Sequence, residues 1–171
     1  MSKHPKIKIK LSKSDWVVEI ISYLLLIAFW MVTIVSFQHL PEEIPTHYNA
    51  LGEADAFGDK ETILILPIIA TFLFFLLSIL SRSPETFNYA VEITEENAEK
   101  QYKNAVWLMR ILRVLITLIF FFIAYQTIQI ALEKAFDLGA WFLPVTFIGL
   151  GLVLGYSIYK SKQINKQKTD Q

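Results

Sequence analysis

Residues 20–37 read IISYLLLIAFWMVTIVSF, eighteen consecutive positions without a charged side chain. A helix needs about 20 residues, at roughly 1.5 Å each, to cross the hydrocarbon of a bilayer. Three further uncharged stretches follow, at residues 62–81, 114–132 and 138–159. One such stretch is compatible with a buried core helix, but a soluble domain of 171 residues rarely needs four. The sequence therefore predicts an all-α integral membrane protein with four transmembrane helices.

The third helix is expected to be longer than the bilayer is thick. Thr94 is a candidate N-cap, followed by acidic residues where the helix dipole favours them. No proline or glycine then occurs before Gly139, so the helix is predicted to run for roughly 40 residues, or about 60 Å. Its first part is therefore expected to extend into the cytoplasm. The predicted organisation is a basic tail (1–15), a membrane domain (16–159, with helices at about 16–37, 62–81, 95–136 and 138–159 and a patterned outer loop at 38–61) and a second basic tail (160–171).

The distribution of charge predicts the orientation. The two tails and the segment 82–113 together hold 14 of the 16 lysines and arginines, and only Lys60 and Lys134 lie in the other two connections. Basic residues favour the cytoplasmic side of a membrane, so both termini are predicted to be cytoplasmic. Eight acidic residues fall in the two outer connections against those two lysines, which gives −6 outside and +6 inside in a chain of zero net charge. We expect the inner face to contact anionic lipid head groups.

Composition excludes several functional classes. Cysteine is absent, which excludes a disulfide framework and a cysteine-ligated metal site. An aromatic content of 14% excludes intrinsic disorder, and the zero net charge lacks the basic excess of a nucleic-acid binder. The chain contains no His-Glu-x-x-His, Gly-x-Ser-x-Gly or glycine-rich phosphate loop. We therefore predict a protein that is not an enzyme, with no catalytic residues, no cofactor, no metal and no nucleic-acid partner.

Ionisable residues inside a predicted span are candidates for function. Glu19 lies near the inner end of the first apolar segment, within expected reach of Arg110 or Arg113 on the third helix. We interpret these three residues as a structural ion pair at the membrane interface. A role in proton or cation coupling is the alternative.

The outer loop has the most unusual pattern in the chain. Asn49, Gly52, Asp55 and Gly58 recur at every third position, which predicts two successive turns, at residues 49–52 and 55–58. The loop is therefore expected to be shaped rather than flexible. Its histidines and aspartates match no standard metal-site spacing, so we expect hydrogen bonds to the backbone instead. The candidate binding residues of the loop are His47, Asn49, Gly52, Asp55, Gly58 and Lys60.

Two further patterns concern helix faces. Gln126, Gln129 and Glu133 are spaced i, i+3 and i+7, which predicts a polar stripe on the outer half of the third helix and adds three binding candidates. Gly151 and Gly155 in the fourth helix have the spacing that allows two helices to approach closely. We expect these glycines to pack within the bundle, and a homodimer face is the alternative.

The outer-loop pattern resembles a known family. Pro41, Ile44-Pro45, His47-Tyr48-Asn49, Gly52, Asp55, Gly58 and Lys60, followed by an apolar helix with Pro67, resemble the bacterial membrane protein family called domain of unknown function 1648. The resemblance continues at Phe87-Asn88-Tyr89 and around Asn97 and Tyr102. That family is similar to the N-terminal part of the sporulation-delaying-toxin immunity protein family. The resemblance implies an immunity or signalling role in the bacterial plasma membrane and assigns no catalytic residues.

We expect a multi-pass plasma-membrane protein that binds an extracellular ligand or partner through the loop 38–61. The negative outer charge favours a cationic peptide as the ligand, and the long third helix offers a route to a membrane or cytoplasmic protein partner. A small solute or ion transporter subunit is the first alternative, because Thr117, Tyr125 and Gln126 place polar groups near the midplane. A metal-dependent enzyme at the outer face is the second.

Overall fold

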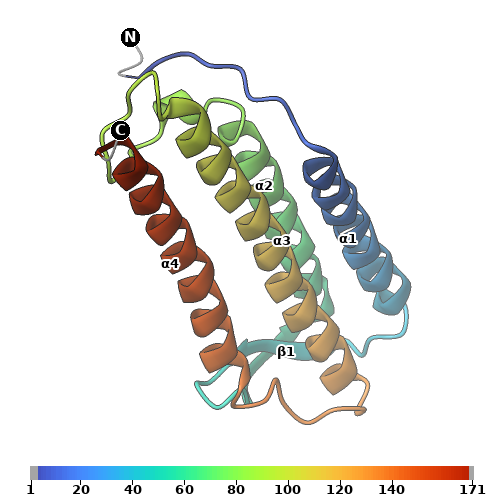
Figure 1. The fold of residues 1–171 in the computed structure, drawn as a ribbon. Helices are drawn as coiled ribbons and strands as arrows, with labels where there is room; N and C mark the ends of the chain where they lie inside the picture. The colour runs from blue at the N-terminus through green and yellow to red at the C-terminus, as the bar shows by residue number, and fades with distance from the viewer. Residues whose placement is uncertain (1–3, 170–171) are drawn as a thin grey trace.

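The computed structural model describes residues 4–169, and the extreme ends of both basic tails, including Lys3, lie outside the described residues. Four long helices run side by side (Figure 1). All four, the second including the short 3-10 helix η1 (Lys60–Leu64) that precedes it, are long and apolar enough to cross a membrane. The chain is therefore a multi-pass membrane protein. The helices are α1 (Lys13–Phe37), α2 (Ile65–Leu80), α3 (Ala98–Ala131) and α4 (Phe142–Thr169).

Helix α3 is the centre of the bundle, because α1, α2 and α4 all pack against it. Both termini lie at one end of the bundle, which we call the tail end, and the opposite end carries a small sheet and is called the hairpin end (Figure 1). A hydrophobic cluster near the hairpin end joins α1, α2 and α3 to this sheet through Phe29, Ile44, Ala70 and Ile128, all 1% exposed or less. Burial of such side chains is the main stabilising contribution to this end.

The loop 38–61 folds into an antiparallel β-hairpin, which adds a two-stranded sheet to a mostly helical protein. Strand β1 (Glu43–Tyr48) pairs with β2 (Ala54–Asp59), with Glu43 opposite Asp59 and Tyr48 opposite Ala54. The first expected turn, 49–52, is present, since Gly52 N donates to Asn49 O at 2.9 Å. The prediction of a second turn at residues 55–58 was wrong, because these residues lie within β2.

Helix α3 is shorter at both ends than the sequence suggested. It begins at Ala98 with Asn97 as the N-cap residue, whereas Thr94 lies before a turn at residues 95–97, and its carbonyl accepts the Ala98 N–H at 2.9 Å. It ends at Ala131, and Glu133 beyond it adopts a left-handed φ of 58°. The helix therefore has 34 residues, about 50 Å at the usual rise.

The N-terminal tail is an ordered part of the bundle. Residues 5–12, here called the strap, run in an extended conformation across the tail end (Figure 1). The hydroxyl of Tyr102 on α3 donates to the carbonyl of Pro5 at 2.7 Å, and Ile7 and Ile9 pack against a buried cluster that contains Ile93 and Tyr102. The strap ends at Ser12, which caps α1. The C-terminal tail is likewise structured, since α4 continues to Thr169.

The glycines of α4 do not pack inside the bundle as expected. A Cβ atom built at Gly149, Gly151 or Gly155 would meet no atom within 4 Å apart from the nearby backbone of its own helix. The close approach for which this spacing is suited is therefore not used within the described chain.

Candidate functional site

The β-hairpin is fixed to the helices by two polar contacts. Tyr48 and Thr127 of α3 share a hydrogen bond of 2.8 Å between their hydroxyls. Because the Thr127 hydroxyl donates to the carbonyl of Ile123, Tyr48 is the donor in that bond. At the hairpin tip, the N–H of Leu138 in the α3–α4 connection donates to the carbonyl of Gly52 at 2.8 Å. The hairpin is thus held against α3 and against the second connection at the same end.

Burial around Tyr48 also affects its ionisation. Desolvation raises the pKa of the Tyr48 phenol above its ordinary value. The phenol is therefore protonated across the neutral range and available as a hydrogen-bond donor.

Asn49 and Gly52 have structural roles in the hairpin turn. The Asn49 side-chain oxygen accepts the N–H groups of Leu51 and Glu53, at 2.9 and 3.1 Å, and its amide donates to the Glu53 carboxylate at 2.8 Å. Gly52 has φ of 85°, and a Cβ there would lie 3.0 Å from the backbone of Gly139. Both residue types suit this turn for reasons of backbone geometry.

His47 and Asp55 form a cross-strand pair on the exposed side of the hairpin. His47 Nδ1 lies 2.5 Å from Asp55 Oδ1, with side chains 69% and 44% exposed. Both residues were sequence-predicted candidates, and the structure brings them together. Among residues 4–169, no group of three or more histidine and acidic side chains is arranged to hold a metal ion.

The remaining loop candidates lie along the two strands. Lys60 is engaged by Glu42, with Nζ 2.7 Å from Oε1. Gly58 faces Thr46 across the sheet, where a Cβ would lie 3.2 Å from the Thr46 methyl group. Neither residue has a free polar group directed at a ligand, so they are better placed to shape the hairpin than to bind.

Among the described residues, no hydrogen bond joins the predicted polar stripe on α3 to the hairpin. Gln126 donates instead to the carbonyl of Asp137 at 3.1 Å, and the Gln129 carbonyl accepts from Lys134. Glu133 follows the end of the helix and is exposed. The residue of α3 that hydrogen-bonds to the hairpin is Thr127, one position from Gln126, and the sequence analysis missed it.

The hairpin end combines acidic and apolar exposed side chains. Leu51 and Phe57 of the hairpin are 59% and 58% exposed, and Phe136 in the neighbouring connection is 95% exposed. Exposed aromatic side chains among charges are typical of interaction surfaces. We call this set the hairpin surface, and it includes the eight exposed carboxylates of Glu42, Glu43, Glu53, Asp55, Asp59, Glu61, Glu133 and Asp137.

A buried charge network lies toward the tail end. Glu19 accepts hydrogen bonds from Arg110 Nε at 3.0 Å and from Arg113 at 2.6 Å, so the structure brings the three predicted residues together. Asp15 was missed, and it accepts from the other arm of Arg110 at 2.6 Å. The spacing of Asp15 and Glu19, four positions apart on one helix face, could have indicated its part.

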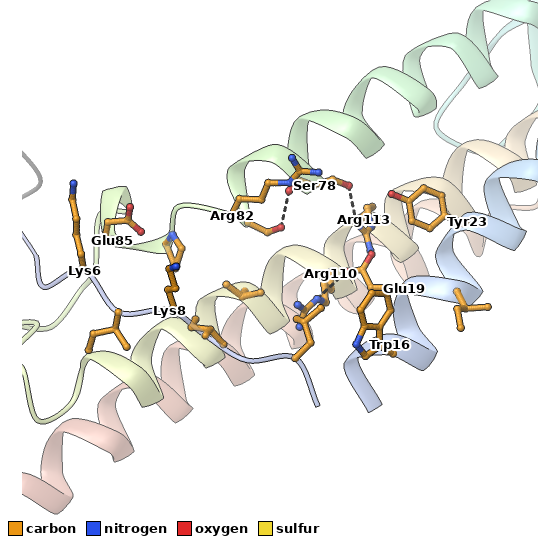
Figure 2. A pocket seen from close by; sticks show the side chains of 17 residues that line it. Lys6, Lys8, Trp16, Glu19, Tyr23, Ser78, Arg82, Glu85, Arg110 and Arg113 are labelled. Carbon is orange, nitrogen blue, oxygen red and sulfur yellow. Dashed lines mark hydrogen bonds and ion pairs between the residues drawn. The ribbon is translucent and has the colours of Figure 1, made fainter. Parts of the chain in front are cut away.

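Sequence analysis also missed a cavity beside this network. It measures about 790 Å³ and lies between the strap, α1, the end of α2 and α3 (Figure 2). The strap lines it with Lys6, Ile7, Lys8 and Ile9. The alternation of lysine and isoleucine over residues 6–10 is the signal of an extended segment with two different faces.

Fold and site together define a four-helix membrane protein with a β-hairpin at one end. Residues 24–71, which include most of α1, the hairpin and the start of α2, match the family model described as domain of unknown function (DUF1648). The match confirms the family resemblance for this part of the chain. It places the hairpin at the centre of the segment that the family shares.

A relative in Archaeoglobus fulgidus, described as an uncharacterized protein, is 45% identical over 40 residues. The alignment covers 23% of this chain and 22% of the relative, so the chain matches about a fifth of that protein's length. No solved structure matches the chain.

Proposed function

We propose that the protein is a non-enzymatic binding protein of the bacterial plasma membrane that captures a cationic, amphipathic peptide on the hairpin surface. In this proposal the hairpin end faces outward and both termini face the cytoplasm, as the distribution of basic residues predicts. An immunity or signalling role would follow from capture of such a peptide outside the cell.

The observation that carries the proposal is the arrangement of exposed side chains on the hairpin surface. The two outer connections hold eight acidic residues and two lysines, and one of the lysines is held by Glu42. This charge attracts cations over a distance of about one Debye length, roughly 8 Å at physiological salt. Phe57 and Leu51 offer apolar contacts on the same hairpin.

The hairpin is also rigid before any ligand binds. Its tip is bonded to Leu138 and its side to Thr127, so little conformational freedom is left to lose when a ligand binds. A two-stranded sheet has an outer edge on each strand, and β2 is exposed at Asp55, Ala56, Phe57 and Asp59. An extended peptide can add to such an edge through backbone hydrogen bonds.

The test uses the whole protein in nanodiscs of uncharged lipid. A labelled peptide of alternating lysine and leucine is titrated, and binding is followed by fluorescence anisotropy. We expect binding that weakens as salt increases, and a loss of roughly tenfold in the Asp55→Asn/Asp59→Asn double variant. Phe57→Ala is expected to weaken binding without changing its salt dependence.

The matched control is Glu92→Gln/Glu95→Gln, which removes the same charge from exposed positions near the tail end. This variant should bind as wild type does. Equal losses in both double variants would mean that only net charge matters and would contradict a hairpin site. Wild-type binding by Phe57→Ala would remove the apolar part of the proposal.

The geometry gives transport less support. The hydroxyls of Thr33, Thr71 and Thr117 donate to carbonyls of their own helices, at 3.0, 2.7 and 2.8 Å. These polar groups inside the spans are thus satisfied locally, and we put forward binding rather than transport.

A further inference from the structure

The cavity at the tail end has a strongly cationic lining. Five basic side chains line it against the carboxylates of Glu19 and Glu85, a net charge of +3 for the lining residues. Arg110 and Arg113 belong to the network with Glu19, whereas Lys6, Lys8 and Arg82 form no ion pair with any residue of 4–169. The uncompensated charge of the lining therefore belongs to these three exposed side chains, which Figure 2 labels.

Arg113, one of the lining residues, is fixed in the wall of the cavity. Arg113 is 2% exposed, and its terminal nitrogens are taken by Glu19, Ser22 and Ser78. Its Nε–H has no hydrogen-bond partner among the described residues. That nitrogen is itself closed to solvent, so we assign the guanidinium to the structure of the cavity wall and not to the ligand. The guanidinium also lies over the ring of Phe74, with Arg113 Cζ 4.6 Å from the ring centroid.

One wall of the cavity is apolar and exposed. Trp16, Ile20 and Tyr23 of α1 line the cavity and are 58%, 56% and 44% exposed. Residues of this kind at the end of a membrane span lie at the level of the lipid head groups, with the aliphatic side chains toward the hydrocarbon. The cavity thus has cations toward the tails and an apolar wall toward the membrane interior.

We propose that this cavity binds the phosphate of one anionic phospholipid, with the head group held by Lys6, Lys8 and Arg82. The acyl chains would then descend along Ile20 and Tyr23. A soluble phosphate would use the cations but not the apolar wall, and the wall is the reason to assign a lipid. The site is distinct from the hairpin surface, at the opposite end of the bundle, so each proposal can fail without the other.

The experiment measures lipid binding to the purified wild-type chain in an uncharged detergent by native mass spectrometry. Phosphatidylglycerol and phosphatidylcholine with the same acyl chains are titrated separately, and the affinity of the first bound lipid is compared. We expect preference for phosphatidylglycerol, with a loss of at least about tenfold in Lys6→Ala/Lys8→Ala/Arg82→Gln, because each basic group contributes several-fold to anionic-lipid affinity. These side chains are exposed, so the variant is expected to fold normally.

The control variant is Lys13→Ala/Lys162→Ala/Lys166→Ala, which removes three positive charges from exposed positions outside the cavity. It should retain the preference. Equal loss in both triple variants, or no preference in wild type, would overturn the proposal. Displacement of the lipid by millimolar glycerol phosphate would show that the phosphate alone is recognised and would overturn the assignment to a lipid.

Discussion

Arg113 on α3 donates a hydrogen bond of 2.6 Å to the carboxylate of Glu19 on α1, with the two side chains 3% and 18% exposed. The bond joins residues 94 positions apart in the chain. The same carboxylate also binds Arg110, whose other arm is paired with Asp15. The packing of α1 on α3 depends on this charge as well as on apolar contacts.

We expect Glu19→Gln to destabilise the protein by about 3–5 kcal/mol, because it leaves buried guanidinium charge uncompensated. Thermal unfolding in detergent, followed by size-exclusion chromatography, measures the loss. Lys103→Ala is the control, since it breaks an exposed pair with Glu99 worth about 0.3–0.5 kcal/mol. Similar losses in the two variants would contradict a structural role for Glu19.

Gly52→Ala should destabilise the hairpin end by about 1–3 kcal/mol. The positive φ disfavours any L side chain, and the new methyl group would meet the Gly139 backbone at 3.0 Å. The same unfolding assay measures the change. Gly151→Ala is the matched substitution at a site with open space, and we expect it to be neutral or stabilising by up to about 1 kcal/mol. If Gly52→Ala were as stable as Gly151→Ala, the positive φ and the close contact at Gly52 would not constrain this position.

Tyr48→Phe removes a partly buried hydrogen bond and should cost about 1 kcal/mol near neutral pH. Because burial raises the pKa of the Tyr48 phenol, its contribution is fully present below the ordinary phenol value of about 10. The contribution is lost as pH rises through the raised pKa. The stability difference between wild type and Tyr48→Phe should therefore shrink in alkaline buffer, and a constant difference would refute the assignment.

His47→Ala and Asp55→Ala should each change stability by less than about 1 kcal/mol, because exposed pairs contribute little. We expect both to weaken peptide binding and any protective effect in cells while membrane levels remain normal. Immunoblotting of membranes gives the level, and growth under peptide challenge gives the effect. Wild-type protection by both variants would leave the pair with a structural role only.

The proposed orientation is testable with single cysteines, because the native chain has none. Ala56→Cys lies on exposed β2 and Lys162→Cys on the exposed surface of α4 near the other end. An impermeant maleimide added to intact cells should label the first and not the second. The reverse pattern would place the hairpin in the cytoplasm.

The helical part of the fold was predictable because each span is an uncharged run. The hairpin was not, since β2 contains alanine, aspartate and glycine, which have low strand propensity, and β1 contains Pro45. Pro45 is compatible with a two-stranded sheet, where every strand has a free edge. What stabilises the strands is tertiary contact at Ile44 and Tyr48, and no local pattern reports it.

The candidate site was predictable only in part. The pairing of His47 with Asp55 depends on strand register, which the expected second turn would have destroyed. The stripe through Gln126 and Glu133 assumed a helix that continued past Leu132, and neither glycine nor proline marks its actual end. The cavity at the tail end forms only because the strap folds back over the helices. Composition alone described these residues as a basic tail and did not indicate that they fold back.

The bond between Pro5 and Tyr102 has a consequence for biosynthesis. The two residues are separated by 97 positions, so the strap emerges from the ribosome long before its docking surface on α3 exists. During synthesis the strap therefore cannot form its contacts with α3 until the third helix has been inserted. The tail-end cavity is therefore assembled after translation of α3, and a chain interrupted before that helix would reach the membrane without it.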